Sequence, residues 1–158
     1  MPKQNSEMLS QLLLVDRTVQ FFNGDGASDS FQLKQGGYNH HIDTQQQEMF
    51  QYLNQQMGIL PSSQKKTFLS NLSKKIQNEH FPGTPVKRAA YLARARAVHQ
   101  VMTKEDPNLV QGFSEKIMTE ILQGVPMSTR SMDNMIHLMK DLDSTSQESF
   151  AAKLFDSM

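Results

Sequence analysis

Residues 84–103 read TPVKRAAYLARARAVHQVMT, and this stretch decides the fold. Thr84 followed by Pro85 is a strong helix start, because threonine caps the first amides and proline is pre-organised for the first turn. At about 100° per residue, the apolar side chains that follow gather on two faces about 140° apart. A helix that is apolar on two sides is expected to lie between other helices. One face holds Val86, Ala89, Ala90, Ala93, Ala97 and Val101, and the other holds Tyr91, Ala95, Val98 and Met102.

Two interpretations of the alanine-rich face stay open at this point. Its small side chains would let a neighbouring backbone approach closely, so the first interpretation makes this helix the core of a bundle. The second makes the alanine face a groove or a seam between two copies of the chain.

Apolar residues recur at helical spacing along the rest of the chain, which predicts an all-α fold. Ser6 is the expected N-cap of the first helix, Thr44 with Gln47 forms a capping-box pattern, and Asp106-Pro107 repeats the threonine-proline start signal. Short connections favour antiparallel neighbours, so we expect a single-domain bundle of six to seven short helices over residues 1–158. The predicted helices cover residues 6–22, 44–57, 63–80, 85–103, 107–123, 128–143 and 145–156.

Residues 23–43, NGDGASDSFQLKQGGYNHHID, interrupt the helical pattern and predict one long glycine-rich loop. The cluster His40, His41 and Asp43 lies in it, and imidazole and carboxylate groups are ligands for zinc. In an extended loop the adjacent histidines would point in opposite directions, so a distant further ligand, His80, His99 or His137, would be required. A metal-dependent enzyme using this loop is therefore the second alternative function.

Composition removes several classes of function. The 158 residues contain no cysteine, which excludes disulfides and thiolate metal sites, and 16 basic residues balance 16 acidic ones. No segment approaches the roughly 20 apolar residues of a membrane span, and no cleavable signal is recognised at the N-terminus. We expect no cofactor, no metal and no catalytic residue, in a protein that is cytoplasmic or exported by a route not using a cleaved N-terminal signal.

Positive charge is concentrated in residues 65–96, where eight cations accompany the single acid Glu79. Such a block favours binding to nucleic acid or anionic lipid, which is the first alternative function. The cations of the fourth helix fall on opposite flanks of the projection, so a solvated, internally paired face ranks above that alternative. The candidate basic patch is Lys74, Lys75, Lys87, Arg88, Arg94 and Arg96.

The chain contains 11 methionines, and three of them share the face of the sixth predicted helix that is expected to be buried, together with Ile136 and Leu142. Thioethers fill irregular gaps in cores, but they also line adaptable grooves that accept a partner helix. If the methionine face is such a groove, the candidate partner-binding residues are Met132, Met135 and Met139, together with Tyr91, Val98 and Met102 of the fourth helix.

Residues 147–158, QESFAAKLFDSM, combine Glu148 and Ser149 with a hydrophobic end at Leu154-Phe155. This segment resembles the C-terminal translocation signals of bacterial type IV secretion substrates. The glutamine-, lysine- and serine-rich, cysteine-free helical composition resembles that of effector proteins of intracellular bacteria. The resemblance assigns no functional residue, and helical periodicity favours an ordinary amphipathic terminal helix that packs on the bundle over a translocation signal.

Together these features favour a non-enzymatic protein–protein interaction module, either an adaptor or a small effector. We expect it to act by docking a helical or methionine-rich face on another protein. A homo-oligomer is a further possibility for the alanine face.

Overall fold

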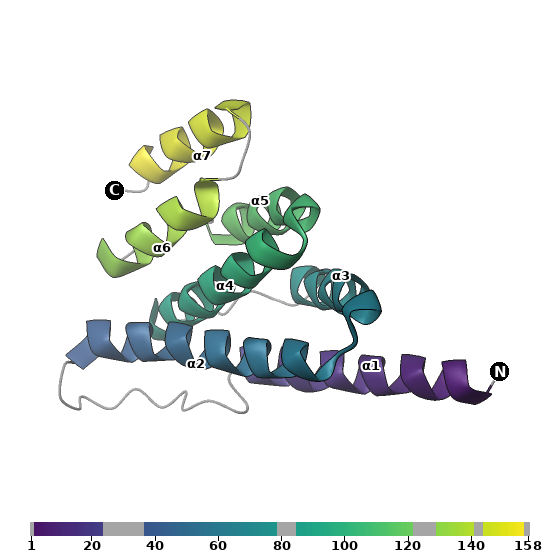
Figure 1. The fold of residues 1–158 in the computed structure, drawn as a ribbon. Coiled ribbons are helices and arrows are strands. Elements are labelled where there is room, and N and C mark those ends of the chain that lie inside the picture. The colour runs from purple at the N-terminus through teal and green to yellow at the C-terminus, as the bar shows by residue number, and fades with distance from the viewer. Residues whose placement is uncertain (1, 24–36, 79–84, 122–128, 141–143, 157–158) are drawn as a thin grey trace.

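The computed structural model describes residues 2–23, 37–78, 85–121, 129–140 and 144–156 (Figure 1). Within these ranges the regular elements are all helices and no strand is present, which confirms the all-α prediction. In chain order the elements are α1 Pro2–Phe22, α2 Gly37–Ile59, α3 Ser62–Asn78, α4 Pro85–Glu105, the 3₁₀ turn η1 Pro107–Leu109, α5 Val110–Ile121, α6 Thr129–Met139 and α7 Ser144–Asp156. None of these helices combines the length and the hydropathy needed to cross a bilayer.

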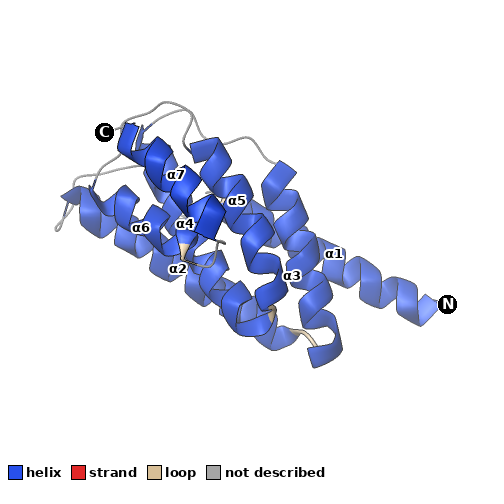
Figure 2. Cartoon of the chain, turned by 90° about the horizontal axis from the view of Figure 1, so that it is seen from above, coloured by secondary structure: helices blue, strands red, loops and turns tan. Residues whose placement is uncertain are grey.

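Helix α4 is the centre of the bundle, as its two apolar faces predict (Figures 1 and 2). It packs against α1, α2, α3, α5 and α6. The alanine face is closed by α2, because Ile42 forms a buried cluster with Ala89 and Ala93. The alternative in which this face is an open groove or a dimer seam is therefore wrong, since Ala89, Ala90, Ala93 and Ala97 are all buried.

The main core surrounds the other face of α4. Phe22 of α1 meets Tyr91 of α4 edge to face, with 4.8 Å between ring centroids, and Phe21 stacks on Tyr52 of α2 at 4.2 Å. Both geometries are favoured by the quadrupoles of aromatic rings. Together they fix the C-terminal end of α1 between α2 and α4.

Helix α2 begins at Gly37, so the predicted start at Thr44 is wrong, and residues 37–43 are helical rather than part of a loop. The physical reason is Ile42, which is buried against α4 only if the helix extends to the N-terminal side of Thr44. Tertiary packing here overrides the low helix propensity of glycine. The rest of the predicted loop, residues 24–36, lies outside the described residues.

Helix α1 begins at Pro2 rather than at the expected Ser6 cap, and its N-terminal half extends beyond the end of α2 (Figures 1 and 2). Leu9, Leu12 and Leu13 are exposed on this half, and Leu9 keeps 59% of its surface in contact with solvent. The buried face of α1 is formed further along by Val15, Val19 and Phe22. Helix α1 thus has a packed C-terminal half and an N-terminal half that exposes leucines.

Candidate functional site

The candidate metal-binding residues lie on the first turns of α2 and not in an extended loop. The side chains of His40 and His41 are outside the described part of the chain, and Asp43 is half-buried with an interaction of its own. Two of the proposed additional ligands, His99 and His137, belong to a different cluster between α4 and α6. The third, His80, lies outside the described residues. Among the described residues, no three histidine, aspartate or glutamate side chains are arranged to hold a metal ion.

The basic segment does not form one exposed patch in the described structure. Arg88 and Arg94 are buried on α4, and burial lowers the pKa of Arg88 below its ordinary value. Arg96 is half-buried. Lys74 and Lys75 are exposed on α3, while the side chain of Lys87 is outside the described residues. Two members of the candidate basic patch, Arg88 and Arg94, are therefore buried rather than exposed, in keeping with the expectation that the cations of this helix do not share one surface.

Hydrogen bonds to neutral side chains bind these arginines to neighbouring helices. Arg94 donates from Nη1 to Oε1 of Gln45 at 2.9 Å, and Arg96 donates from Nη1 to Oδ1 of Asn134 at 2.9 Å. Lys75 instead forms an exposed ion pair with Asp16 of α1. Arg94, Arg96 and Lys75 therefore each form a polar contact between two helices of the bundle.

A small polar cluster lies beside Arg96, between α4 and α6. The guanidinium Nη2 of Arg96 is 3.4 Å from Nδ1 of His137, and the His137 ring meets the ring of His99 edge to face at 5.8 Å. His99 is 2% exposed, so this cluster is closed to solvent on the α4 side. The contact between two imidazoles and a guanidinium positions α6 against α4.

Most of the candidate partner-binding residues with described side chains are core residues. Tyr91, Val98 and Met102 of α4 and Met135 of α6 are each at most 3% exposed. They cannot touch a partner unless the bundle opens, so they are removed from the candidate surface. Met139 is partly buried, and the side chain of Met132 is outside the described residues.

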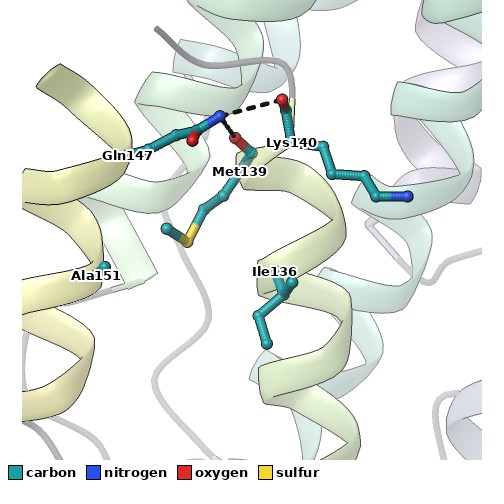
Figure 3. Close-up of a pocket in the computed structure, with 5 residues that line it drawn as sticks. All are labelled: Ile136, Met139, Lys140, Gln147 and Ala151. Atoms are coloured by element: carbon teal, nitrogen blue, oxygen red, sulfur yellow. Dashed lines mark hydrogen bonds between the residues drawn. The ribbon is translucent and has the colours of Figure 1, made fainter. Parts of the chain in front are cut away.

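The methionine face of α6 nevertheless borders a pocket. The pocket has a volume of about 450 Å³. It is lined by Ile136 and Met139 of α6, by Lys140 directly after this helix, and by Gln147 and Ala151 of α7. Figure 3 shows the Met139 side chain directed from α6 towards α7, while Lys140 extends away from α7. Ile136, predicted as a core residue, is 53% exposed, and Leu138 is buried in its place.

Gln147 fixes α7 at one end of this pocket. Its Nε2 donates to the backbone oxygens of Met139 at 3.2 Å and Lys140 at 3.1 Å (Figure 3). The last carbonyls of a helix have no partner within the helix, so the Gln147 amide satisfies two of them on α6.

The described lining of the pocket is mainly apolar. Ile136, Met139 and Ala151 supply apolar surface, and its volume lies in the range of ordinary ligand pockets. Sequence reasoning found Met139 but missed Lys140, Gln147 and Ala151, because the pocket exists only where two helices meet. No family model, curated protein or solved structure is significantly similar to this chain.

Proposed function

We propose that this protein is a non-enzymatic interaction module that binds a partner protein at the pocket between α6 and α7. The observation that carries the proposal is the exposure of Ile136 at the edge of a pocket walled by Met139 and Ala151. A half-exposed isoleucine beside a flexible thioether offers apolar area that a partner can cover and a wall that adapts to it.

In this proposal the protein acts as an adaptor or as a small secreted effector. The resemblance of residues 147–158 to type IV translocation signals supports export, and residues 147–156 of this segment belong to α7. The basic segment supports the nucleic-acid alternative less well, because Arg88 and Arg94 are buried and Lys75 is paired with Asp16.

Site-specific photocrosslinking tests the docking site. A benzophenone amino acid is placed at Ile136 in one sample and at the exposed Lys66 of α3 in another, and both proteins are irradiated in an extract of the source cells. We expect a discrete adduct with one protein at Ile136 and none at Lys66. Ile136 is half-exposed, so Ile136→Asp should leave the fold intact and should abolish capture of that same protein by an immobilised sample.

A matched control replaces a residue of similar exposure elsewhere. Leu13→Asp introduces the same charge at a 51% exposed position on α1, far from the pocket in the chain. Capture that survives Ile136→Asp, or that is lost equally with Leu13→Asp, contradicts the assignment of the pocket as the binding site.

A further inference from the structure

Two histidines meet where α6 packs against α4 (Figure 1). The rings of His99 on α4 and His137 on α6 lie edge to face, with 5.8 Å between their centroids. His99 is 2% exposed, and His137 is half-buried. Imidazole is the side chain that ordinarily changes its charge just below neutral pH. The contact between these two helices therefore contains two groups whose charge depends on the pH of the solution.

Arg96 determines which form of His137 fits this contact. Its Nη2 lies 3.4 Å from Nδ1 of His137. A guanidinium only donates hydrogen bonds, so Nδ1 must accept and the ring must carry its proton on Nε2. A protonated His137 would turn this hydrogen bond into a contact between two cations, which is unfavourable. The observed arrangement is therefore that of a neutral His137.

His99 is also suited to the neutral form. It follows Arg96 by three residues, so both side chains lie on the same side of α4. Its burial removes the water that would solvate an imidazolium. A proton on His99 would thus add a second positive charge beside Arg96 in a poorly hydrated contact. Burial and the neighbouring guanidinium both oppose protonation of this ring.

Other charged residues on α5 and α6 include both acids and bases. Helix α5 packs against both α4 and α6, and its described charged residues are Glu115 and Lys116, each half-buried. On α6, Arg130 and Asp133 precede His137 by seven and four residues, and their side chains are outside the described residues. Each of these pairs consists of one cation and one anion, so neither pair changes the net positive charge that Arg96 brings to the contact.

The elements on the other sides of α4 also carry charged side chains. They include Asp43 and Glu48 of α2, the surface pair of Asp16 and Lys75 on α1 and α3, and Asp106 before η1. Helix α2 covers the alanine face, which is about 140° from His99 in helical projection, and Asp106 follows His99 by about 10 Å along the axis. Coulomb interactions weaken with distance. Among the described charges, the guanidinium at 3.4 Å therefore has the largest effect on His137.

We infer that the contact between α4 and α6 is a proton-sensitive joint, stable while His99 and His137 are neutral and weakened when the solution is acidified. In the unfolded chain both histidines bind protons with the ordinary pKa of about 6.5. The folded contact excludes those protons, so the stability that it provides is present above this pH and is lost as the pH falls below it. Because Ile136 and Met139 also lie on α6, opening of the joint would move one wall of the pocket. That consequence for docking rests on the proposed function, whereas the joint itself does not.

Nuclear magnetic resonance of the intact, isotope-labelled protein tests the protonation states directly. Long-range proton–nitrogen spectra of the imidazoles are recorded from about pH 8 to about pH 5, and His99→Gln and His137→Gln serve to assign the signals. We expect His137 to carry its proton on Nε2 at neutral pH and both rings to titrate below about pH 6.5. A proton on Nδ1 of His137, or a midpoint at or above that pH for either ring, overturns the inference.

A pair of matched variants tests the role of the guanidinium. Arg96→Gln removes the positive charge beside the two rings, so the titration midpoint of His137 should rise. Lys104→Gln removes an exposed cation further along α4 and should leave that midpoint unchanged. A midpoint that does not move in Arg96→Gln, or that moves equally in both variants, contradicts the role of Arg96 in the joint.

Urea unfolding at about pH 7.5 and at about pH 5.5 measures how acid affects the stability of the fold. Over this interval the folding equilibrium constant should fall about tenfold for each histidine that the folded protein keeps neutral, and thus about a hundredfold for the pair. His137→Gln keeps an acceptor for Arg96 but binds no proton, so its loss should be about tenfold smaller than that of the wild type. Equal losses in the two proteins refute the joint. Failure of the crosslink at Ile136 would refute the docking function and leave these titrations standing.

Discussion

Nη1 of Arg94 on α4 lies 2.9 Å from Oε1 of Gln45 on α2, and both side chains are buried. A guanidinium away from water requires hydrogen-bond acceptors, because its desolvation is unfavourable unless it is compensated. The neutral amide of Gln45 supplies one of them, and it fixes the N-terminal half of α2 to the central helix.

Removing this acceptor should destabilise the protein. We expect Gln45→Leu to lower the free energy of unfolding in urea by about 1–3 kcal/mol, because Arg94 then loses a buried partner. The double variant Gln45→Leu/Arg94→Met should recover part of the loss, since replacing both polar partners with apolar groups is tolerated better. Gln55→Leu, at an exposed position of the same helix, is the control and should change stability by less than about 0.5 kcal/mol. A double variant less stable than Gln45→Leu would contradict this account.

The exposed leucines of α1 should contribute little to the stability of the fold. Leu13→Ala is expected to change the free energy of unfolding by less than about 0.5 kcal/mol, because Leu13 is 51% exposed. Leu72→Ala, the same change at a fully buried position of α3, should cost about 2–5 kcal/mol. Urea titration of both variants makes the comparison. Similar losses in the two would mean that Leu13 is covered in solution, and light scattering would then show whether a second copy covers it.

The ion pair between Asp16 and Lys75 connects α1 to α3 at the surface. Both side chains are about half exposed, so we expect Lys75→Gln to reduce stability by at most about 1 kcal/mol. The loss should shrink in high salt, because screening already weakens an exposed pair. Lys74→Gln, one residue away, serves as the control. A loss at Lys75 that is independent of salt would argue against a Coulombic contribution.

Nucleic acid should bind weakly. Arg88 and Arg94 are buried and Lys75 is paired, which leaves few exposed cations from the described part of the basic segment. We therefore expect no retardation of duplex DNA by the intact protein in a gel-shift assay at low salt. Retardation that weakens steeply with salt and disappears in a Lys65→Gln/Lys66→Gln/Lys74→Gln variant would restore the nucleic-acid alternative.

The sequence predicts the central helix well and the surface poorly. The two apolar faces of residues 84–103 indicate burial on both sides, and the structure encloses α4 accordingly. The pattern could not show that Arg94 is also inside, because a cation is ordinarily a surface residue and Gln45 is distant in the chain. The sequence also places the start of α2 too late, at Thr44, because glycine is a poor helix former. The contact of Ile42 with α4, which favours the longer helix, joins residues that are distant in the chain.

The candidate site was only half predictable. The methionine periodicity pointed to Met139, which lines the pocket, but it placed Ile136 inside and did not indicate Gln147 or Ala151 as lining residues. A pocket formed by two helices depends on how far apart their axes lie, and helical periodicity carries no information on that distance.

The central position of α4 has a consequence for biosynthesis on the ribosome. Residues that precede Pro85 form α1, α2 and α3, whose buried side chains, such as Leu53, Phe68 and Leu72, close around a helix that has not yet been translated. The first half of the nascent chain therefore leaves the exit tunnel with these apolar side chains exposed, because α4 is not yet there to cover them. Such intermediates are prone to aggregation, which makes the first half of synthesis the stage at which we expect a chaperone to be needed.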